Sequence, residues 1–454
     1  MRSLRARLNL GILIGITLIL ALNGVLIYMV VRARLFKELD QSLATVAQSF
    51  ASQISVELNP SKWQGSERAD YVLSGVHLWA PGRSERNRNV EPIPAQDLWE
   101  RIHQLRHDAD SILIDGVNDG MDDACGIAHL LGLESVVLVP LEAIASRDEA
   151  RIDRLITLAN RGDVDVAVIG RKVLDRGVLT EEELGRYLRL VRSNVPKSVR
   201  LTTADSVEAY LDHPKLLSDI DFLFPIYDPF SRGTHIENAV PQISCWHQDL
   251  VASARGKAVV VAETGWPTSG ESKGSAVPSS HNAARYFTDF VTWARLNEVR
   301  YYYASGIDGP HSDESWGYRT TSGSLKPGMQ TVFDGLLPQE SVPTILLTPP
   351  WKPRTLGLQG GIARHVPPFA HAVALYLRVG GMWWNKPSFA DAMTPIGCDG
   401  SWQADITTGA GDEGADRVIA FLLPIHYIPP MLDGEDVIPQ QIFEVALAVA
   451  EMDL

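Results

Sequence analysis

Residues 257–267 read Lys-Ala-Val-Val-Val-Ala-Glu-Thr-Gly-Trp-Pro. The apolar residues 258–262 form an unbroken run rather than an alternation, which is typical of a strand buried on both faces of a parallel sheet. Glu263 follows directly, and the Gly-Trp-Pro sequence marks the end of the strand. Because burying an unpaired carboxylate costs several kcal/mol, Glu263 needs either a function or a cationic partner.

Similar runs recur along the chain and predict eight strands, over residues 71–79, 111–115, 135–139, 164–170, 198–204, 219–226, 257–263 and 299–305. Helical patterns lie between them, and one of these follows a capping box of Thr180 and Glu183. Eight β/α repeats predict an α/β fold, a (β/α)8 TIM barrel over residues 71–335, with its sites at the carboxyl ends of the strands. An open doubly wound sheet is the alternative, but no Gly-x-Gly-x-x-Gly follows the first strand.

Residues 342–454 have a different sequence pattern. They contain short strand candidates, many prolines, and turn residues at Gly380-Gly381 and Asp399-Gly400. This pattern predicts a small accessory β-sandwich. Its three tryptophans either fill the core or bind carbohydrate; they are Trp383, Trp384 and Trp402. Acidic residues between 399 and 416 lack the ligand spacing of a known calcium loop, so we expect a solvated face there and no metal site.

The N-terminal segment predicts a membrane anchor. No side chain from Leu8 to Val31 is charged, and arginines flank the run on both sides. As a helix this run would extend about 36 Å, enough to cross a bilayer, whereas the apolar core of a cleaved signal peptide has about 7 to 15 residues. We therefore expect a cytoplasmic tip and transmembrane helix within residues 1–34. The balanced flanking charge leaves the orientation open, and we expect a signal anchor in the cell membrane with the large C-terminal part extracytoplasmic.

Residues 35–70 should form a juxtamembrane helix and a linker. Apolar residues recur at spacings of three and four over residues 35–57, with charged and amide side chains between them. This pattern predicts an amphipathic helix that either pairs with a second copy, giving a homodimer, or lies against its own domain.

Composition and charge exclude several classes of protein. Hydrophobic residues make up 45% and charged residues 21%, which fits neither a disordered chain nor a polytopic membrane protein. A net charge of -14 makes nucleic acid an unsuitable partner. Cys125, Cys245 and Cys398 lie far apart in the sequence, which excludes a disulfide-rich scaffold and a zinc ribbon. No metal or other cofactor is expected.

Two strand ends should face each other across the mouth of the barrel. The fourth strand ends in Gly170-Arg171-Lys172 and the seventh ends in Glu263. From these residues alone, Glu263 either acts chemically or only pairs with a neighbouring lysine or arginine.

The run Val-Val-Val-Ala-Glu-Thr-Gly-Trp-Pro-Thr-Ser-Gly at residues 259–270 resembles the signature of glycoside hydrolase family 17, the β-1,3-glucanases and related glucan transglycosylases. Shorter segments resemble the bacterial branch of this family: residues 160–166, 174–180, 202–205, 317–318 and 325–328. The resemblance covers roughly residues 72–329. It implies a retaining enzyme on β-1,3-glucan or a related β-glucan, in which one glutamate is the nucleophile and a second is the general acid/base.

The resemblance places Glu263 at the nucleophile position. The Asn-Glu that the family carries after strand four is replaced by Arg171-Lys172, so Lys172 stands where the acid/base belongs. An ammonium group cannot protonate a glycosidic oxygen as a carboxylic acid of raised pKa does, and close pairing would hold Glu263 ionised. Other departures from the family pattern occur at 113–115, 225 and 304–310, whereas Tyr227 and Trp316 match it.

Three hypotheses follow. The first is a membrane-anchored, degenerate enzyme that binds glucan more than it cuts it. The second is an active retaining glucanase or transglycosylase in which Asp308 or Asp175 supplies the proton. The third is a non-catalytic carbohydrate sensor or scaffold that dimerises through residues 35–57. In each case four aromatic residues either stack on sugar rings or only pack; they are Tyr227, Trp266, Tyr303 and Trp316.

Overall fold

The structure is a computed structural model that describes residues 72–78, 93–118, 120–309, 314–335, 342–348 and 357–454. These residues belong to one compact unit, Ala69–Leu454. The predicted membrane span and the predicted dimerising helix lie outside the described residues. Within the described ranges, no helix combines the length and the apolar character needed to cross a bilayer.

Eight parallel strands form the sheet of the N-terminal part. They are β1 (Val76–Leu78), β2 (Ser111–Asp115), β3 (Glu134–Val139), β4 (Val166–Arg171), β5 (Arg200–Asp205), β6 (Phe224–Pro225), β7 (Val261–Thr264) and β8 (Tyr301–Tyr303). Their order is β6-β5-β4-β3-β2-β1-β8-β7. Parallel bridges from Leu223 to Val259 and from Ile226 to Glu263 connect β6 to β7 and close the ring. The barrel predicted from the sequence is confirmed, and each of the eight predicted strands overlaps a strand of the structure.

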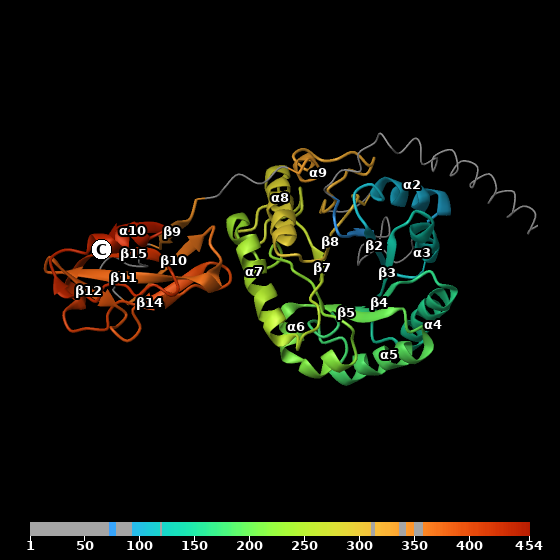
Figure 1. Ribbon diagram of the computed structural model, residues 1–454, viewed down its shortest axis with the longest axis horizontal. Helices are drawn as coiled ribbons and strands as arrows, with labels where there is room; N and C mark the ends of the chain where they lie inside the picture. The colour runs from blue at the N-terminus through green and yellow to red at the C-terminus, as the bar shows by residue number, and fades with distance from the viewer. Residues whose placement is uncertain (1–71, 79–92, 119, 310–313, 336–341, 349–356) are drawn as a thin grey trace, which may run out of the picture. The chain divides into compact units, whose positions relative to one another are not determined.

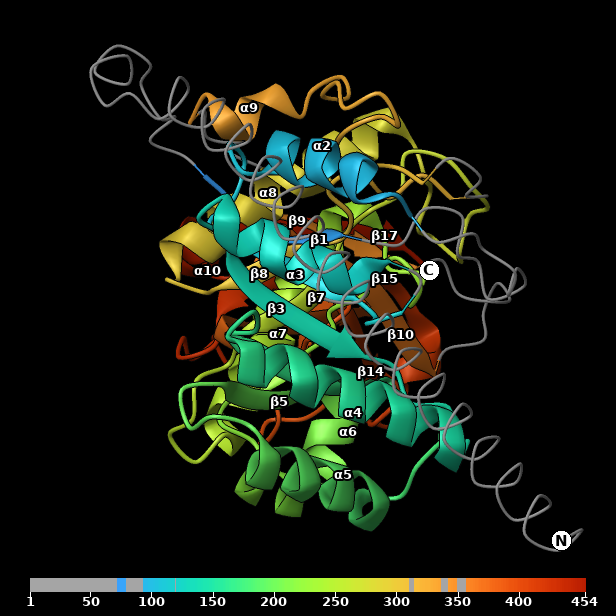
Figure 2. The same cartoon turned by 90° about the vertical axis from the view of Figure 1, so that its right-hand side faces the viewer.

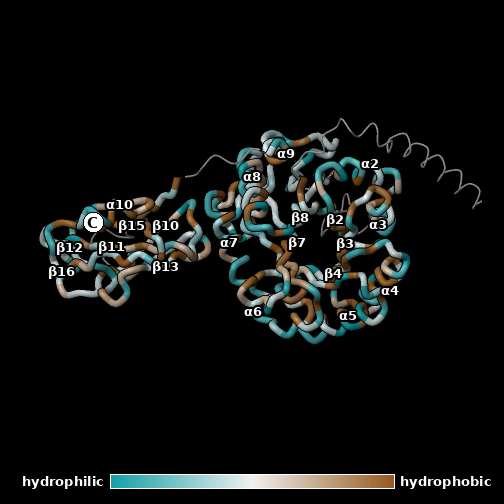
Figure 3. Tube along the Cα trace, in the orientation of Figure 1, coloured by the Kyte–Doolittle hydropathy of each residue, from teal (hydrophilic) through white to brown (hydrophobic). Residues whose placement is uncertain are grey.

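Helices surround this ring of strands (Figure 1). They are α2 (Ala95–Leu105), α3 (Met121–Leu130), α4 (Ala145–Arg161), α5 (Glu181–Asn194), α6 (Val207–Asp212), α7 (Ile236–Ser253) and α8 (Ser280–Leu296), with the short η2 (Pro214–Ser218) and α9 (Gln330–Phe333). The capping box predicted at Thr180 and Glu183 begins α5. Figure 2 shows α4 and α5 along the outside of the barrel, and Figure 3 shows polar and apolar stretches alternating along both helices.

The strands are buried on both faces, which explains their continuous apolar runs. Alternate residues of β4 divide between two clusters: Val166 and Val168 fill the barrel interior, whereas Ala167 and Ile169 pack in the layer against the helices. The interior of the barrel is therefore packed with side chains below its mouth, and only the carboxyl ends of the strands can hold a site.

The C-terminal part contains two antiparallel sheets. Their strands are β9 (Thr344–Leu347), β10 (Leu358–Arg364), β11 (His371–Val379), β12 (Met382–Lys386), β13 (Thr394–Pro395), β14 (Ser401–Asp405), β15 (Ala415–Pro424), β16 (Asp433–Glu435) and β17 (Ala448–Asp453). Three short helices accompany them: η3 (Pro368–Ala370), η4 (Asp412–Gly414) and α10 (Gln440–Val445). The sheet β14-β10-β9 shares a core with the sheet β16-β12-β11-β15-β17, which is the arrangement of a β-sandwich.

The tryptophans of the sandwich are largely internal. Trp402 is 3% exposed in the core between the sheets, and Trp383 is 9% exposed in the cluster beneath α10. Trp384 is half-buried on β12. The acidic residues of this region are engaged by neighbours: Asp412 pairs with the buried Lys386, and Asp416 pairs with Arg378.

Helix α7 is bonded to the sandwich segment of the chain. A disulfide joins Cys245 of α7 to Cys398. Asn238 Nδ2 donates to the carbonyl oxygens of Ala363 and Asp399 at 3.2 and 2.6 Å. The sequence separation of 153 residues hid this pairing, because spacing along the chain does not report proximity in the fold.

Candidate functional site

Charged side chains gather at the carboxyl ends of the barrel strands. We use the term mouth for the group formed by His77 of β1, Asp115 of β2, Arg171 of β4 and Glu263 of β7. His77 and Glu263 interact electrostatically with each other, and Arg171 interacts with both carboxylates. The mouth therefore lies where TIM barrels carry their chemistry.

Two β-bulges orient the central pair of the mouth. On β4, Val168 pairs with Thr202 and Arg171 pairs with Ala204. Between these two pairs β4 therefore has one residue more than β5. On β7, Val261 faces Tyr301 and Thr264 faces Tyr303, which again leaves one extra residue on the bulged strand. Each extra residue reverses the alternation of side chains at the strand end.

The effect of the bulges on side-chain direction is clear from the packing. Val168 and Ala262 point into the barrel, so regular alternation would turn Arg171 and Glu263 outward. Instead these two side chains meet each other, while Thr264 bonds to Tyr286 on the outer helix α8. Gly170, with φ +85°, permits the bulge on β4; a Cβ there would lie 2.9 Å from Val173 Cγ2.

Arg171 and Glu263 form a bidentate ion pair. Arg171 Nε donates to Glu263 Oε2 at 2.9 Å, and Arg171 Nη2 donates to Glu263 Oε1 at 2.7 Å. The side chains are only 20% and 17% exposed. Burial alone would raise the pKa of Glu263, but the guanidinium outweighs it and lowers that pKa to about 2. Both carboxylate oxygens are thus occupied by one cation.

His77 and Asp115 complete the mouth. Burial lowers the pKa of the His77 imidazole, while the nearby carboxylates of Glu263 and Asp115 oppose that shift. His77 is fully buried, so neighbouring protein groups rather than solvent surround its ring. Sequence reasoning missed His77 as a site residue; its position in the first strand of the barrel was the available signal.

Lys172 lies one residue beyond the ion pair and has a different partner. Its backbone is left-handed, with φ +52°, and its Nζ lies 3.6 Å from Asp228 Oδ2. Its positive charge helps to lower the pKa of Glu263, but less than the charge and the hydrogen bonds of Arg171 do. The prediction that a cation holds Glu263 ionised agrees with this geometry, but the residue in contact is Arg171 rather than Lys172.

Asp308, the suggested substitute acid, is held by other groups. Lys326 Nζ lies 2.8 Å from Asp308 Oδ2, and the Gly317 amide donates to Asp308 Oδ1 at 2.8 Å. Side-chain exposures of 8% for Lys326 and 12% for Asp308 make this a largely buried pair. In this arrangement the Asp308 carboxylate stabilises the loop after β8 through Lys326 and the Gly317 amide, and it is not available to a ligand as an acid.

Three of the four aromatic residues proposed as sugar platforms are buried. Tyr227 and Tyr303 are 0% exposed and Trp266 is 1% exposed, so none presents a ring face to a ligand here. Trp266 Nε1 donates to the carbonyl of Val277. Trp316 is half-buried and donates to Glu314 Oε2 at 2.9 Å, so it alone of the four retains exposed surface.

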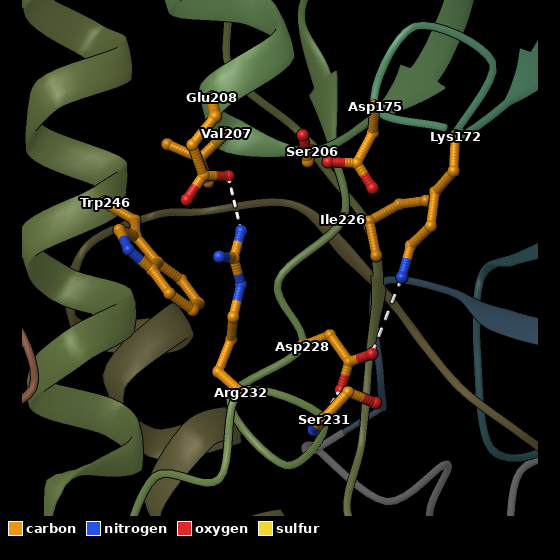
Figure 4. Close-up of a pocket in the computed structure, with 10 residues that line it drawn as sticks. All are labelled: Lys172, Asp175, Ser206, Val207, Glu208, Ile226, Asp228, Ser231, Arg232 and Trp246. Atoms are coloured by element: carbon orange, nitrogen blue, oxygen red, sulfur yellow. Dashed lines mark hydrogen bonds and ion pairs between the residues drawn. The ribbon is translucent and has the colours of Figure 1, made fainter. Parts of the chain in front are cut away.

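A pocket of about 280 Å³ opens beside the mouth, over the ends of β4, β5 and β6 (Figure 4). We name it the Trp246 pocket; its charged and aromatic residues are Lys172, Asp175, Glu208, Asp228, Arg232 and Trp246. Two ion pairs cross it, Lys172–Asp228 and Arg232–Glu208 (Figure 4). Sequence reasoning did not single out Trp246, because a half-buried tryptophan on a helix carries no signal in the sequence.

Among the described residues, one set of potential metal ligands lies close together: Cys245, Asp249 and Cys398. Both cysteines of this set form the disulfide, which removes their thiolates as ligands. The buried Asp205 at the end of β5 instead accepts three backbone N–H groups, from Leu174, Asp175 and Ser206, and thereby holds the loop after β4.

Comparisons with known proteins agree with the barrel. Residues 96–321 match the family model described as the BtgE/BtgC glycoside hydrolase domain. The chain is 28% identical over 172 residues to "Glucan 1,3-beta-glucosidase" of Arthroderma benhamiae, covering 35% of this chain and 54% of that protein. It is 26% identical over 125 residues to "Probable family 17 glucosidase SCW10" of Saccharomyces cerevisiae, covering 26% and 32% respectively. The chain thus spans about a third to a half of the length of these relatives.

Solved structures show the same fold. A glycoside hydrolase family 17 β-1,3-glucanosyltransferase from Rhizomucor miehei aligns with a TM-score of 0.51 and 22% identity, over 57% of this chain and 96% of that one. An active-site mutant of the Rhizomucor enzyme has been solved with laminaritriose. These relatives are fungal, and the bacterial branch inferred from the sequence stays a prediction. Residues 96–321 of this chain form a glycoside hydrolase family 17-like domain.

Proposed function

We propose that this protein binds β-1,3-glucan or a related β-glucan through its barrel and hydrolyses it weakly or not at all. The observation that carries the proposal is the bidentate Arg171–Glu263 pair at the mouth. A nucleophile must present a free carboxylate oxygen to the anomeric carbon of the sugar. Each oxygen of Glu263 accepts a hydrogen bond from the guanidinium, which lowers its nucleophilicity and fixes its orientation, so attack is hindered while this buried pair is intact.

Two of the three positions expected to hold a general acid offer no free carboxyl group, and the third, Asp175, lines the Trp246 pocket beside Lys172. A retaining glycosidase needs a second carboxyl group about 5 to 5.5 Å from the nucleophile. Lys172 occupies the family position and is a cation, and Asp308 is paired with Lys326. Losing general acid assistance typically lowers the rate by about 10² to 10⁴. The separation of the Arg171–Glu263 pair adds a further barrier.

We also propose that residues 8–31 anchor the protein in a membrane with the barrel outside the cytoplasm. The Cys245–Cys398 disulfide supports this location, because disulfides persist in oxidising compartments and are rare in the cytosol. Dimerisation through residues 35–57 stays a proposal drawn from the amphipathic pattern alone.

Two assays of the full-length protein test the main proposal: sedimentation with insoluble β-1,3-glucan, and release of reducing ends from laminarin. We expect the wild-type protein to sediment with the glucan and to release few or no reducing ends. The double variant R171N/K172E restores the Asn-Glu pair of the family and frees Glu263. It should raise hydrolysis by about 10²-fold or more, since it supplies the missing acid.

The matched control is R378N, which removes an arginine–carboxylate pair from the exposed face of the sandwich. It should leave both readouts unchanged. Substantial turnover by the wild-type protein that disappears in E263Q would overturn the proposal, because Glu263 would then act as a nucleophile despite Arg171. Absence of glucan sedimentation would overturn the binding part.

A further inference from the structure

The Trp246 pocket includes Lys172, the residue that follows Arg171 of the occupied mouth, and the Lys172–Asp228 pair forms part of its lining. It lies at the carboxyl ends of β4, β5 and β6, where a TIM barrel binds its ligands. Apart from Lys172, which stands at the acid/base position, the charged residues of the pocket have no part in the mechanism expected of the family. The pocket can therefore be considered as a binding site in its own right.

The charges of the pocket disfavour an anionic ligand and suit a ligand that carries hydroxyl groups. Arg232 Nη2 lies 2.6 Å from Glu208 Oε2, and Lys172 Nζ lies 3.6 Å from Asp228 Oδ2, so each cation already faces a carboxylate. An anionic ligand would have to separate one of these pairs or add negative charge beside the exposed Asp175, whereas a donor group can bind Asp175 without disturbing them. Hydroxyl groups can donate to the carboxylates and accept from the cations while the pairs stay intact.

An aromatic wall stands across the pocket from Lys172 (Figure 4). Trp246 is half-buried on α7, and its ring lies 6.0 Å from that of the buried Tyr227. The barrel core thus supports the indole from behind, while part of it lines the pocket. A fixed, amphipathic ring of this kind offers contact area at low entropic cost and suits the C–H face of a pyranose.

The size of the pocket limits the ligand. Its volume of about 280 Å³ lies just below the range of roughly 300–1,000 Å³ that holds drug-sized molecules. A single pyranose ring suits such a space better than several consecutive rings of a chain. A glucan can place a single ring in a space of this size most simply at a chain end.

We propose that the Trp246 pocket binds one neutral sugar ring, the terminal residue of a β-glucan chain. Trp246 forms the stacking platform, and the carboxylates of Asp175 and Asp228 accept hydrogen bonds from ring hydroxyls. This inference rests on the proposed function, since it assigns the glucan binding of the barrel to a site beside Glu263. The protein would then recognise chain ends rather than the interior of the polymer.

Isothermal titration of the full-length protein with laminaritriose tests the assignment. W246A should weaken binding about tenfold or more, because it removes the aromatic contact. D175N changes an exposed side chain and should weaken binding several-fold without affecting folding. The matched control is W384A, which truncates a half-buried tryptophan of the sandwich; it should bind as the wild type does.

Ligands of different length test recognition of the chain end. Per chain, laminarin and laminaritriose should bind with affinities within a few-fold of each other, since each chain offers the same ends. Two further ligands identify the sugar ring that the pocket holds. If free glucose competes effectively with laminaritriose, the pocket binds a free monosaccharide. If borohydride-reduced laminaritriose no longer binds, the pocket holds the reducing end of the chain. Affinity that rises steadily with chain length would overturn the proposal.

The failure of this inference is distinguishable from that of the proposed function. If wild-type, W246A and D175N proteins all bind laminaritriose equally, the pocket assignment is wrong while glucan binding stands. If W384A alone loses binding, the sandwich holds the sugar instead. If the wild-type protein binds neither laminaritriose nor insoluble glucan, both proposals fail.

Discussion

The mouth and the Trp246 pocket lie next to each other on the same barrel, and consecutive residues of one strand end supply a cation to each. Arg171 joins Glu263 through two hydrogen bonds in a largely buried setting, whereas Lys172 faces Asp228 at 3.6 Å beside open space. The mouth therefore keeps its charges engaged with one another, and the pocket leaves room for a ligand. The position of a family nucleophile therefore does not by itself locate a binding site in this barrel.

The most severe way to disturb this contrast is to remove Arg171. We expect R171A to lower the free energy of unfolding by about 3–5 kcal/mol, because it leaves Glu263 buried without its charge partner. Urea denaturation at pH 7, followed by circular dichroism, measures this change. The double variant R171M/E263L removes both charges and should recover most of the loss. A loss below 1 kcal/mol in R171A would mean that solvent reaches Glu263 freely.

Acid tests the same pair without a change at Arg171. The folded-state pKa of Glu263, about 2, lies below its ordinary value of 4.5. A depressed pKa contributes stability that is present above pH 4.5 and is lost as pH falls toward 2. The contribution is roughly 3 kcal/mol. Unfolding free energies measured between pH 5 and pH 2 should fall less steeply for E263Q than for the wild type; equal slopes would contradict the pairing.

The smallest effect should follow from removing Lys172. K172A should lower the free energy of unfolding by less than about 1 kcal/mol, because Lys172 and Asp228 make one contact at 3.6 Å, whereas Arg171 and Glu263 make two hydrogen bonds. K172G also removes the pair but accepts the left-handed backbone of this position without strain, so it separates the two contributions. If K172A proved as costly as R171A, the contrast between the two cations would disappear.

The fold of the barrel was predictable because its signal is local. Strands buried on both faces need continuous apolar runs, and each of the eight runs overlaps a strand of the structure. The capping box at Thr180 and Glu183 is equally local and is present. The Cys245–Cys398 pairing depends on the path of the whole chain, and no spacing rule could give it.

The site was predictable only in part. Glu263 lies at the mouth as expected from its position after the seventh strand. Its partner was not predictable because the bulge on β4 reverses side-chain alternation, so Arg171 rather than Lys172 points toward Glu263. The aromatic residues were ambiguous for a related reason: Trp266 and Tyr303 are buried by side chains from distant segments, which a single sequence does not display.

The two bulges also make the chemistry of the mouth depend on the number of residues in a strand as well as on their identity. Regular alternation from Val168 through Gly170 would turn Arg171 away from Glu263, with every side chain unchanged in type. Deleting Gly170 would not have this effect, because it removes the extra residue and leaves Arg171 two positions after Val168, on the same face of the strand. In evolutionary terms, a change of backbone register at one strand end separates an occupied nucleophile from an exposed one.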